Sequence, residues 1–201
     1  MRERERQLEG KLFDAHAEEL MKIKAQAHKL CKEYNDLPEN DPKRWEIGRN
    51  LLGKTGENFY MQGPIQFNYG KNTTIGEMFF SNFNFTVLDD GPITIGNHVM
   101  IGPNVSLMSS SHPLLFGERE AMTYPDGHTG MSEYAPPIVI EDHVWIACGA
   151  VICGGVTIGE GSVIGAGSVV VKDIPAGVLA VGNPCKPIRK ITEADSKMDL
   201  L

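Results

Sequence analysis

Histidine is the side chain of this sequence best suited to acid–base chemistry at neutral pH. The chain of 201 residues holds six histidines. His112 differs from the others because it lies in the turn Ser111-His112-Pro113, where a repeating pattern stops. A histidine in ordinary surroundings has a pKa near ~6.5 and can accept a proton from a hydroxyl group. His112 is therefore our candidate general base. His98, His128 and His143 are candidates by residue type alone, and His16 and His28 lie in helix-like sequence.

The four cysteines are less promising as nucleophiles. They are Cys31, Cys148, Cys153 and Cys185, and no two of them form a Cys-x-x-Cys pair. The chain begins with alternating charges and has no apolar segment of the kind that directs export. We therefore expect four reduced thiols in a cytoplasmic protein, not a disulfide framework.

Charge and hydropathy exclude two classes of partner. The formal net charge is −7, whereas proteins that bind nucleic acids carry a strongly basic face. No apolar run approaches the length of a membrane span. An acidic chain can still hold one local basic site, so an anionic small-molecule cofactor remains possible.

A six-residue repeat predicts the fold. Large aliphatic residues recur at every sixth position from Ile140: Ile146, Ile152, Ile158, Ile164 and Val170. Small or β-branched residues follow four positions later, and the same frame appears earlier, from Ile95 to Leu107. A period of six fits neither an amphipathic helix nor an alternating strand. It indicates a solenoid whose short strands stack their aliphatic residues inward, with glycine at tight corners.

The repeat is interrupted between Leu107 and Ile140. Residues 113–137 form a polar stretch with glycine and proline, and His112 lies at its root. A solenoid gains nothing from a break in its stacking, and long loops in compact domains are usually functional or disordered. We therefore predict a loop that leaves the coils beside a site.

The N-terminal quarter has a different pattern. Apolar residues at spacings of three and four predict helices over residues 8–15, 20–34 and 45–52, with Asp41-Pro42 beginning the last. We expect packing against the solenoid to be their main role. The predicted organisation is a helical region at 1–57, a β-helix domain at 58–190 and a C-terminal tail at 191–201.

Several segments, taken in order along the chain, resemble the maltose/galactoside acetyltransferase branch of the hexapeptide-repeat transferases. They are the runs 8–15 (LEGKLFDA), 79–90 (FFSNFNFTVLDD), 111–113 (SHP), 144–146 (VWI) and 182–189 (GNPCKPIR). The resemblance implies a left-handed parallel β-helix, which is mainly β, and a homotrimer. It also implies direct transfer of an acetyl group from acetyl-CoA to a sugar hydroxyl, without a metal.

The resemblance also assigns roles to individual residues. His112 matches the catalytic base. The acceptor-site positions are Asn68, Phe80, Asn82 and Asp90. The positions along the pantetheine arm are Trp145, Cys148, Ala166, Val171 and Lys172, and those at the charged end of coenzyme A are Lys186 and Arg189. Maltose-type enzymes tend to have Asp, and galactoside-type enzymes Ser, where this chain has Asn68. Phe80 replaces the Tyr of the galactoside type.

Three other functions compete with this interpretation. A transferase of the same fold could acetylate an antibiotic or another xenobiotic alcohol, although the N-terminal helical region argues against it. A metal-dependent hydratase on the same β-helix would need a histidine cluster that the sequence does not suggest. A non-catalytic scaffold would leave His112 and the long loop without a use.

Overall fold

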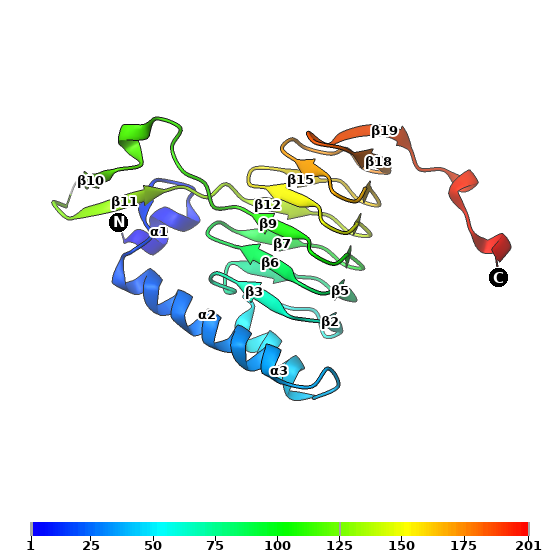
Figure 1. The fold of residues 1–201 in the computed structure, drawn as a ribbon, viewed down its shortest axis with the longest axis horizontal. Coiled ribbons are helices and arrows are strands. Elements are labelled where there is room, and N and C mark those ends of the chain that lie inside the picture. The colour runs from blue at the N-terminus through cyan, green and yellow to red at the C-terminus, as the bar shows by residue number, and fades with distance from the viewer. Residues whose placement is uncertain (1, 125, 201) are drawn as a thin grey trace.

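The computed structural model describes residues 2–124 and 126–200, and most of them form a parallel β-helix (Figure 1). Short strands alternate around three faces, and each strand pairs in parallel with its equivalents in the coils above and below. The hexapeptide solenoid predicted from the sequence is confirmed.

Each face presents a different row of outward-pointing side chains. The threonine face exposes Thr74, Thr94, Val139 and Thr157, which are aligned by register. Its strands are β4 (Thr73–Ile75), β7 (Ile93–Ile95), β12 (Ile138–Ile140) and β15 (Thr157–Ile158). This row is mostly polar, as expected for a face in contact with water.

The second face, called the aromatic face here, has an apolar outer row. In register order the row is Tyr60, Phe80, Met100, Trp145, Val163 and Leu179. The strands are β2 (Phe59–Met61), β5 (Phe79–Ser81), β8 (Met100–Ile101), β13 (Trp145–Ile146), β16 (Val163–Ile164) and β18 (Val178–Val181). An antiparallel strand, β19 (Lys186–Lys190), ends this sheet.

The third face carries the strand that leads to His112. Its strands are β3 (Ile65–Phe67), β6 (Phe85–Leu88), β9 (Ser106–Met108), β14 (Val151–Cys153) and β17 (Val169–Val170). The inward residues of all three faces form one buried core, which includes Ile101, Ile146 and Ile152. Burial of stacked aliphatic side chains is the main stabilising contribution to such a fold.

The corners of the coils use left-handed backbone conformations. Gly161 and Gly177 have positive φ at one corner, where His98 (φ 55°) and His143 (φ 61°) occupy the equivalent positions of lower coils. Non-glycine residues adopt this region only when the surrounding structure holds them there. The regular coil geometry therefore tolerates a few side chains at positions that favour glycine.

Two long helices cover the first coil. They are α2 (Glu18–Asp36) and α3 (Lys43–Leu51), which lie below β2 and β3 in Figure 1. Cys31, Tyr34 and Leu51 join the same buried core as Met61 and Ile65. The second and third predicted helices are confirmed. The structure does not test the predicted boundaries at residues 57 and 190, which stay predictions.

The first predicted helix is wrong. Residues 8–15 are not helical as a unit, because α1 (Glu3–Leu8) ends there and Gly10 turns the chain with φ 67°. Phe13 and Asp14 form strand β1 instead. The apolar spacing arises from burial of Phe13 and Ala15 against Leu20, and not from a helical face.

The long interruption contains regular structure. It leaves the coils at Pro113, makes a short 3-10 helix, η1 (Phe116–Glu118), and then a hairpin of β10 (Ala121–Thr123) and β11 (Thr129–Glu133). Strand β11 also pairs with β1, so the three form a small antiparallel sheet beside α1 (Figure 1). The predicted loop is thus a hairpin anchored on the N-terminal segment.

Candidate active site

His112 lies where two chain segments meet. Its neighbour Ser111 forms an isolated antiparallel bridge with Tyr134, and the two backbone N–H···O hydrogen bonds measure 2.9 and 3.1 Å. In antiparallel pairing the next residues, His112 and Glu133, stand opposite one another. The His112 side chain is exposed. The start and the end of the hairpin thus hold the turn that carries the imidazole.

Asn68, Asp90 and His112 gather at one edge of the third face. They follow β3, β6 and β9, which are neighbouring strands in three successive coils. The Asn68 amide donates hydrogen bonds of 3.1 and 3.0 Å to the two carboxylate oxygens of Asp90. Asp90 is only 1% exposed. The structure therefore brings together three of the predicted site residues.

The electrostatics of Asp90 reflect this environment. Burial raises the pKa of the Asp90 carboxyl, while the Asn68 hydrogen bond and the nearby Lys24 and His112 oppose the rise. A carboxylate held by an amide can accept further hydrogen bonds from the hydroxyl groups of a ligand.

Glu133 belongs to the same cluster, and the sequence reasoning missed it. It is half-buried on β11, and burial raises the pKa of its carboxyl; Asp90 adds to the rise, while His112 and Lys24 oppose it. The only sequence signal was its place at the far root of the interruption, opposite His112. The position of Glu133 opposite His112 can be recognised only when the fold of the hairpin is known.

The aromatic face holds the second group of predicted residues. A groove of about 650 Å³ runs along it and is lined by Phe80, Asn82, Trp145, Cys148 and Ala166, together with Met100, Pro103 and Leu179. Phe80 and Asn82, predicted with the acceptor residues, therefore lie in this groove and not among the groups around Asp90. Within the described chain, the predicted site is divided between two faces.

The remaining predicted cofactor residues lie near the upper end of the β-helix. Val171 and Lys172 are exposed directly after β17. Lys186 and Arg189 are exposed on β19, and Arg189 stands opposite Leu179, a residue of the aromatic-face groove. Directly opposite residues on paired strands point to the same side of the sheet. The register therefore places Arg189 beside Leu179, on the side of the sheet that carries the groove.

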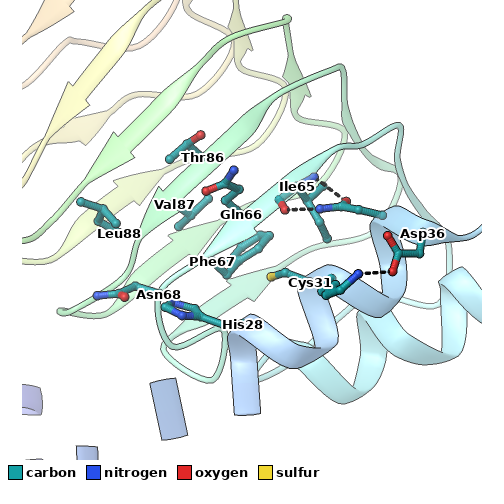
Figure 2. A pocket seen from close by; sticks show the side chains of 12 residues that line it. His28, Cys31, Asp36, Ile65, Gln66, Phe67, Asn68, Thr86, Val87 and Leu88 are labelled. Carbon is teal, nitrogen blue, oxygen red and sulfur yellow. Dashed lines mark hydrogen bonds and ion pairs between the residues drawn. The ribbon is translucent and has the colours of Figure 1, made fainter. Parts of the chain in front are cut away.

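A second groove lies between α2 and the third face (Figure 2). It has a volume of about 420 Å³, and Cys31, Phe67, Asn68 and Leu88 are among its lining residues. Asn68 belongs both to this groove and to the cluster with Asp90. Burial raises the pKa of the Cys31 thiol to about 11, so this cysteine is protonated and a poor nucleophile at neutral pH.

The other histidines have structural surroundings. His128 stacks on Tyr124 with ring centroids 4.4 Å apart and contacts Asp126 at 2.5 Å. His98 and His143 stack across adjacent coils, with centroids 5.0 Å apart. The sequence reasoning foresaw no such pair. Over residues 2–124 and 126–200, no group of three or more His, Cys, Asp or Glu side chains is arranged to hold a metal ion.

The helices are too short or too polar to be bilayer spans. In the part of the chain that the structure describes, none has the length and apolar character that crossing a membrane requires.

Comparisons with family models match two parts of the chain. Residues 6–56 match the maltose acetyltransferase hexapeptide capping motif. Residues 137–172 match six repeats of the bacterial transferase hexapeptide. The first match covers the end of α1 together with β1, α2 and α3, and the second covers the uninterrupted coils after the hairpin.

Individual relatives match nearly the whole chain. A galactoside O-acetyltransferase of Escherichia coli is 41% identical over 92% of this chain and 88% of its own length. The structure of a galactoside acetyltransferase in complex with coenzyme A is similar with a TM-score of 0.88, 40% identity, and coverage of 97% of this chain and 94% of that one. A maltose O-acetyltransferase of Clostridium difficile gives a TM-score of 0.88 and 41% identity, covering 96% of this chain and 99% of that one.

Proposed function

Because the chain belongs to the hexapeptide-repeat acetyltransferases that include the maltose and galactoside O-acetyltransferases, we propose that it acetylates a hydroxyl group of a sugar or glycoside, with His112 as the general base. The predicted family is confirmed, and the chain is an acetyl-CoA-dependent O-acetyltransferase built on a left-handed β-helix. The observation that carries the proposal is the cluster of Asn68, Asp90 and His112 at one edge of three coils.

His112 supplies the proton chemistry. Its imidazole accepts the proton of the acceptor hydroxyl while the oxygen attacks the thioester carbonyl carbon. The tetrahedral intermediate collapses with loss of the coenzyme A thiolate, and protonated His112 returns the proton to that sulfur. Atoms and charge balance without an acyl-enzyme. The exposed Cys148 thiol takes no part in this route, and a backbone N–H is the better donor to the developing oxyanion.

We assign the orientation of the acceptor to Asn68 and Asp90 beside His112 and to Phe80 and Asn82 in the aromatic-face groove. Asp90 accepts hydrogen bonds from sugar hydroxyls, and Asn68 and Asn82 can both donate and accept them. Phe80 offers an apolar ring surface to the sugar. These roles rest on the family resemblance together with the burial of Asp90 and its hydrogen bonds to Asn68.

The aromatic-face groove and β19 suit the cofactor. In this proposal Trp145, Cys148, Ala166, Val171 and Lys172 line the path of the pantetheine arm. Lys186 and Arg189 bind the charged end, because cations form charge-assisted hydrogen bonds with phosphate. The position of Arg189 opposite Leu179, at the groove's upper end, supports this assignment.

We further propose that the active site is shared between chains of a homotrimer. His112 and Asp90 lie at the edge of the third face, whereas the groove with Asn82 and Trp145 lies on the aromatic face. Met100, Trp145 and Tyr60 in the outer row of that face are between 39% and 53% exposed. Exposed apolar surface of this extent is typical of an interface or a ligand groove. Packing one chain's third face against a neighbour's aromatic face would join the two halves around a three-fold axis.

Acceptor screening tests the proposed function. The purified protein is mixed with acetyl-CoA and, separately, with glucose, maltose, a galactoside and chloramphenicol, and released thiol is measured. We expect thiol release that depends on a sugar or glycoside. Thiol release with chloramphenicol alone would show that the acceptor is a xenobiotic alcohol and not a sugar. Absence of thiol release with every alcohol would contradict the proposed activity.

A further inference from the structure

The side chain of Arg189 is held by the C-terminal tail. Its Nη1 and Nη2 atoms donate hydrogen bonds of 2.7 and 2.6 Å to the two carboxylate oxygens of Asp195. Nη1 also donates to the backbone carbonyl of Lys190 at 3.1 Å. The Nη1 and Nη2 atoms of the guanidinium group are therefore fixed in a bidentate ion pair.

Asp195 is itself fixed in place. It lies in a short 3-10 helix, η2 (Glu193–Asp195), and its side chain accepts a hydrogen bond of 2.9 Å from the backbone N–H of Thr192. The backbone N–H of Asp195 in turn donates to the Thr192 carbonyl at 2.9 Å. The hydrogen bond from Thr192 satisfies one free backbone N–H at the helix start and holds the carboxylate in one orientation.

One edge of the guanidinium group stays available. Among the hydrogen bonds of the described residues, none uses the Nε–H of Arg189, and Nη2 carries a second N–H beyond the one given to Asp195. An Nε–Nη2 edge matches two oxygens of a phosphate group. Because Arg189 lies opposite Leu179, its side chain stands on the side of the sheet that carries the groove.

We propose that Asp195 is a positioning residue for the cofactor, which holds Arg189 with its Nε–Nη2 edge free to receive the 3′-phosphate of coenzyme A. This inference rests on the proposed cofactor assignment of Arg189. An arginine side chain loses rotamer freedom when it binds a ligand, and the ion pair with Asp195 removes that freedom beforehand. The short helix η2 of the tail thereby becomes part of the cofactor site.

The sign of the effect separates positioning from simple charge. Asp195 is negative, so its Coulomb interaction alone weakens the binding of an anion, and removing the charge should tighten binding. Positioning predicts the opposite, since a mobile Arg189 binds phosphate less well. The Arg189 ion pair lowers the pKa of Asp195 to about 2, so the carboxylate stays ionised at any pH suitable for the assay.

Calorimetric titration with coenzyme A tests the inference without needing the acceptor. We expect Asp195→Asn to raise the dissociation constant of coenzyme A roughly two- to tenfold, with a smaller effect on 3′-dephospho-coenzyme A. Asp195→Glu should recover part of the affinity, because it restores a carboxylate. The matched control is Glu193→Gln, which removes the same charge from the same short helix without touching Arg189. It should leave binding unchanged or slightly tighter.

Two further variants distinguish the possible failures. If Arg189→Ala weakens binding and Asp195→Asn does not, the positioning role is wrong while the cofactor assignment stands. If Arg189→Ala itself leaves binding unchanged, both are wrong. In the double variant, Asp195→Asn should weaken binding no further than Arg189→Ala does, because the positioning acts only through that side chain. A further loss of affinity in the double variant would place Asp195 in a separate role.

Discussion

At the scale of single residues, His112 combines a fixed backbone with a free side chain. The bridge between Ser111 and Tyr134 holds its turn, while the imidazole stays exposed. We expect His112→Ala to lower turnover by roughly a hundred- to ten-thousandfold, which is the usual contribution of a general base. Steady-state release of thiol measures it. The fold should be retained because His112 lies outside the stacked aliphatic rows.

The control is a histidine at a corner of the coils. His143→Gly should keep nearly normal turnover, because glycine adopts the positive φ of that position without strain. Turnover close to wild type in His112→Ala would show that this residue is not the base.

Asp89 should make stability depend on pH. Its side chain accepts hydrogen bonds of 2.8 Å from the Tyr69 backbone and 2.9 Å from Thr73, yet burial raises its pKa from 3.8 to about 6. Between pH 3.8 and about pH 6, the Asp89 carboxyl group is protonated in the folded chain and ionised in the unfolded chain. The contribution of Asp89 to the unfolding free energy therefore increases as pH falls through about 6 and is complete below 3.8.

Melting temperatures of Asp89→Asn and of the wild type, measured at several pH values, isolate the contribution of Asp89 to the pH dependence of stability. From about pH 7 to about pH 4.5, we expect the wild-type melting temperature to gain roughly 5 °C relative to the variant. Other carboxyl groups titrate in both proteins and cancel in the difference. An equal pH response in the two proteins would show that Asp89 has an ordinary pKa.

Sequence position and resemblance predicted part of the candidate site. Asn68, Asp90 and His112 end neighbouring strands of one face, so a repeating coil brings them to a single edge. The contribution of Glu133 could not be predicted in this way. It depends on the pairing of two loop roots more than twenty residues apart, and nothing in the local sequence specifies that pairing.

At the scale of elements, the hairpin of β10 and β11 is the part least visible in the sequence. Its strands are short and polar, and their order comes from pairing with β1, where Phe13 is fully buried. The pairing of β1 with β11 is also the reason that the helix predicted for residues 8–15 does not form. A two-residue strand has no periodicity to detect, so only the folded partner reveals it.

Gly130 on β11 tests how this hairpin is docked. A Cβ atom added there would lie 2.4 Å from the carboxylate carbon of Asp14, a buried residue of β1. Gly130→Ala should push β1 and β11 apart and destabilise the protein by about 1–3 kcal/mol, as overpacking does. Turnover should fall as well, since β11 carries Glu133 opposite His112. Calorimetry and thiol release measure the two effects.

Gly117→Ala is the matched control in the same loop. A Cβ at Gly117 meets no atom within 4 Å, and this glycine does not have positive φ. Both stability and turnover should stay at the wild-type level. If Gly130→Ala behaves the same way, the contact with Asp14 does not hold the hairpin.

At the scale of the whole molecule, the six-residue period determined the architecture. Ile146 and Ile152 fill one continuous core because their spacing repeats the geometry of a face. The repeat did not reveal which face would meet other chains in the proposed trimer, because that depends on the side chains in the outward rows. The outward row is polar at Thr74 and Thr94 on one face and apolar at Met100 and Trp145 on another, and this difference distinguishes the faces.

A shared site predicts complementation between inactive variants. His112→Ala and the double variant Lys186→Glu/Arg189→Glu should each be nearly inactive alone. Refolded together, they should regain a fraction of wild-type turnover, because an intact His112 of one chain can face intact cations of its neighbour. Chains with different affinity tags show that mixed trimers have formed.

Two outcomes would contradict the shared site. Mixed trimers without activity would place His112 and the two cations in the same chain's site. A monomer in analytical sedimentation would reject the shared site entirely.

The helices beneath the first coil have a consequence for solubility. A parallel β-helix ends in strands whose N–H and C=O groups could pair with another molecule, as strands do in amyloid fibres. Here α2 and α3 lie under β2 and β3, and Tyr34 and Leu51 share the core of that coil (Figure 1). At the opposite end, β19 runs antiparallel to β18 and breaks the parallel register. The helices thus oppose end-to-end growth from the first coil, to which a regular solenoid is otherwise prone.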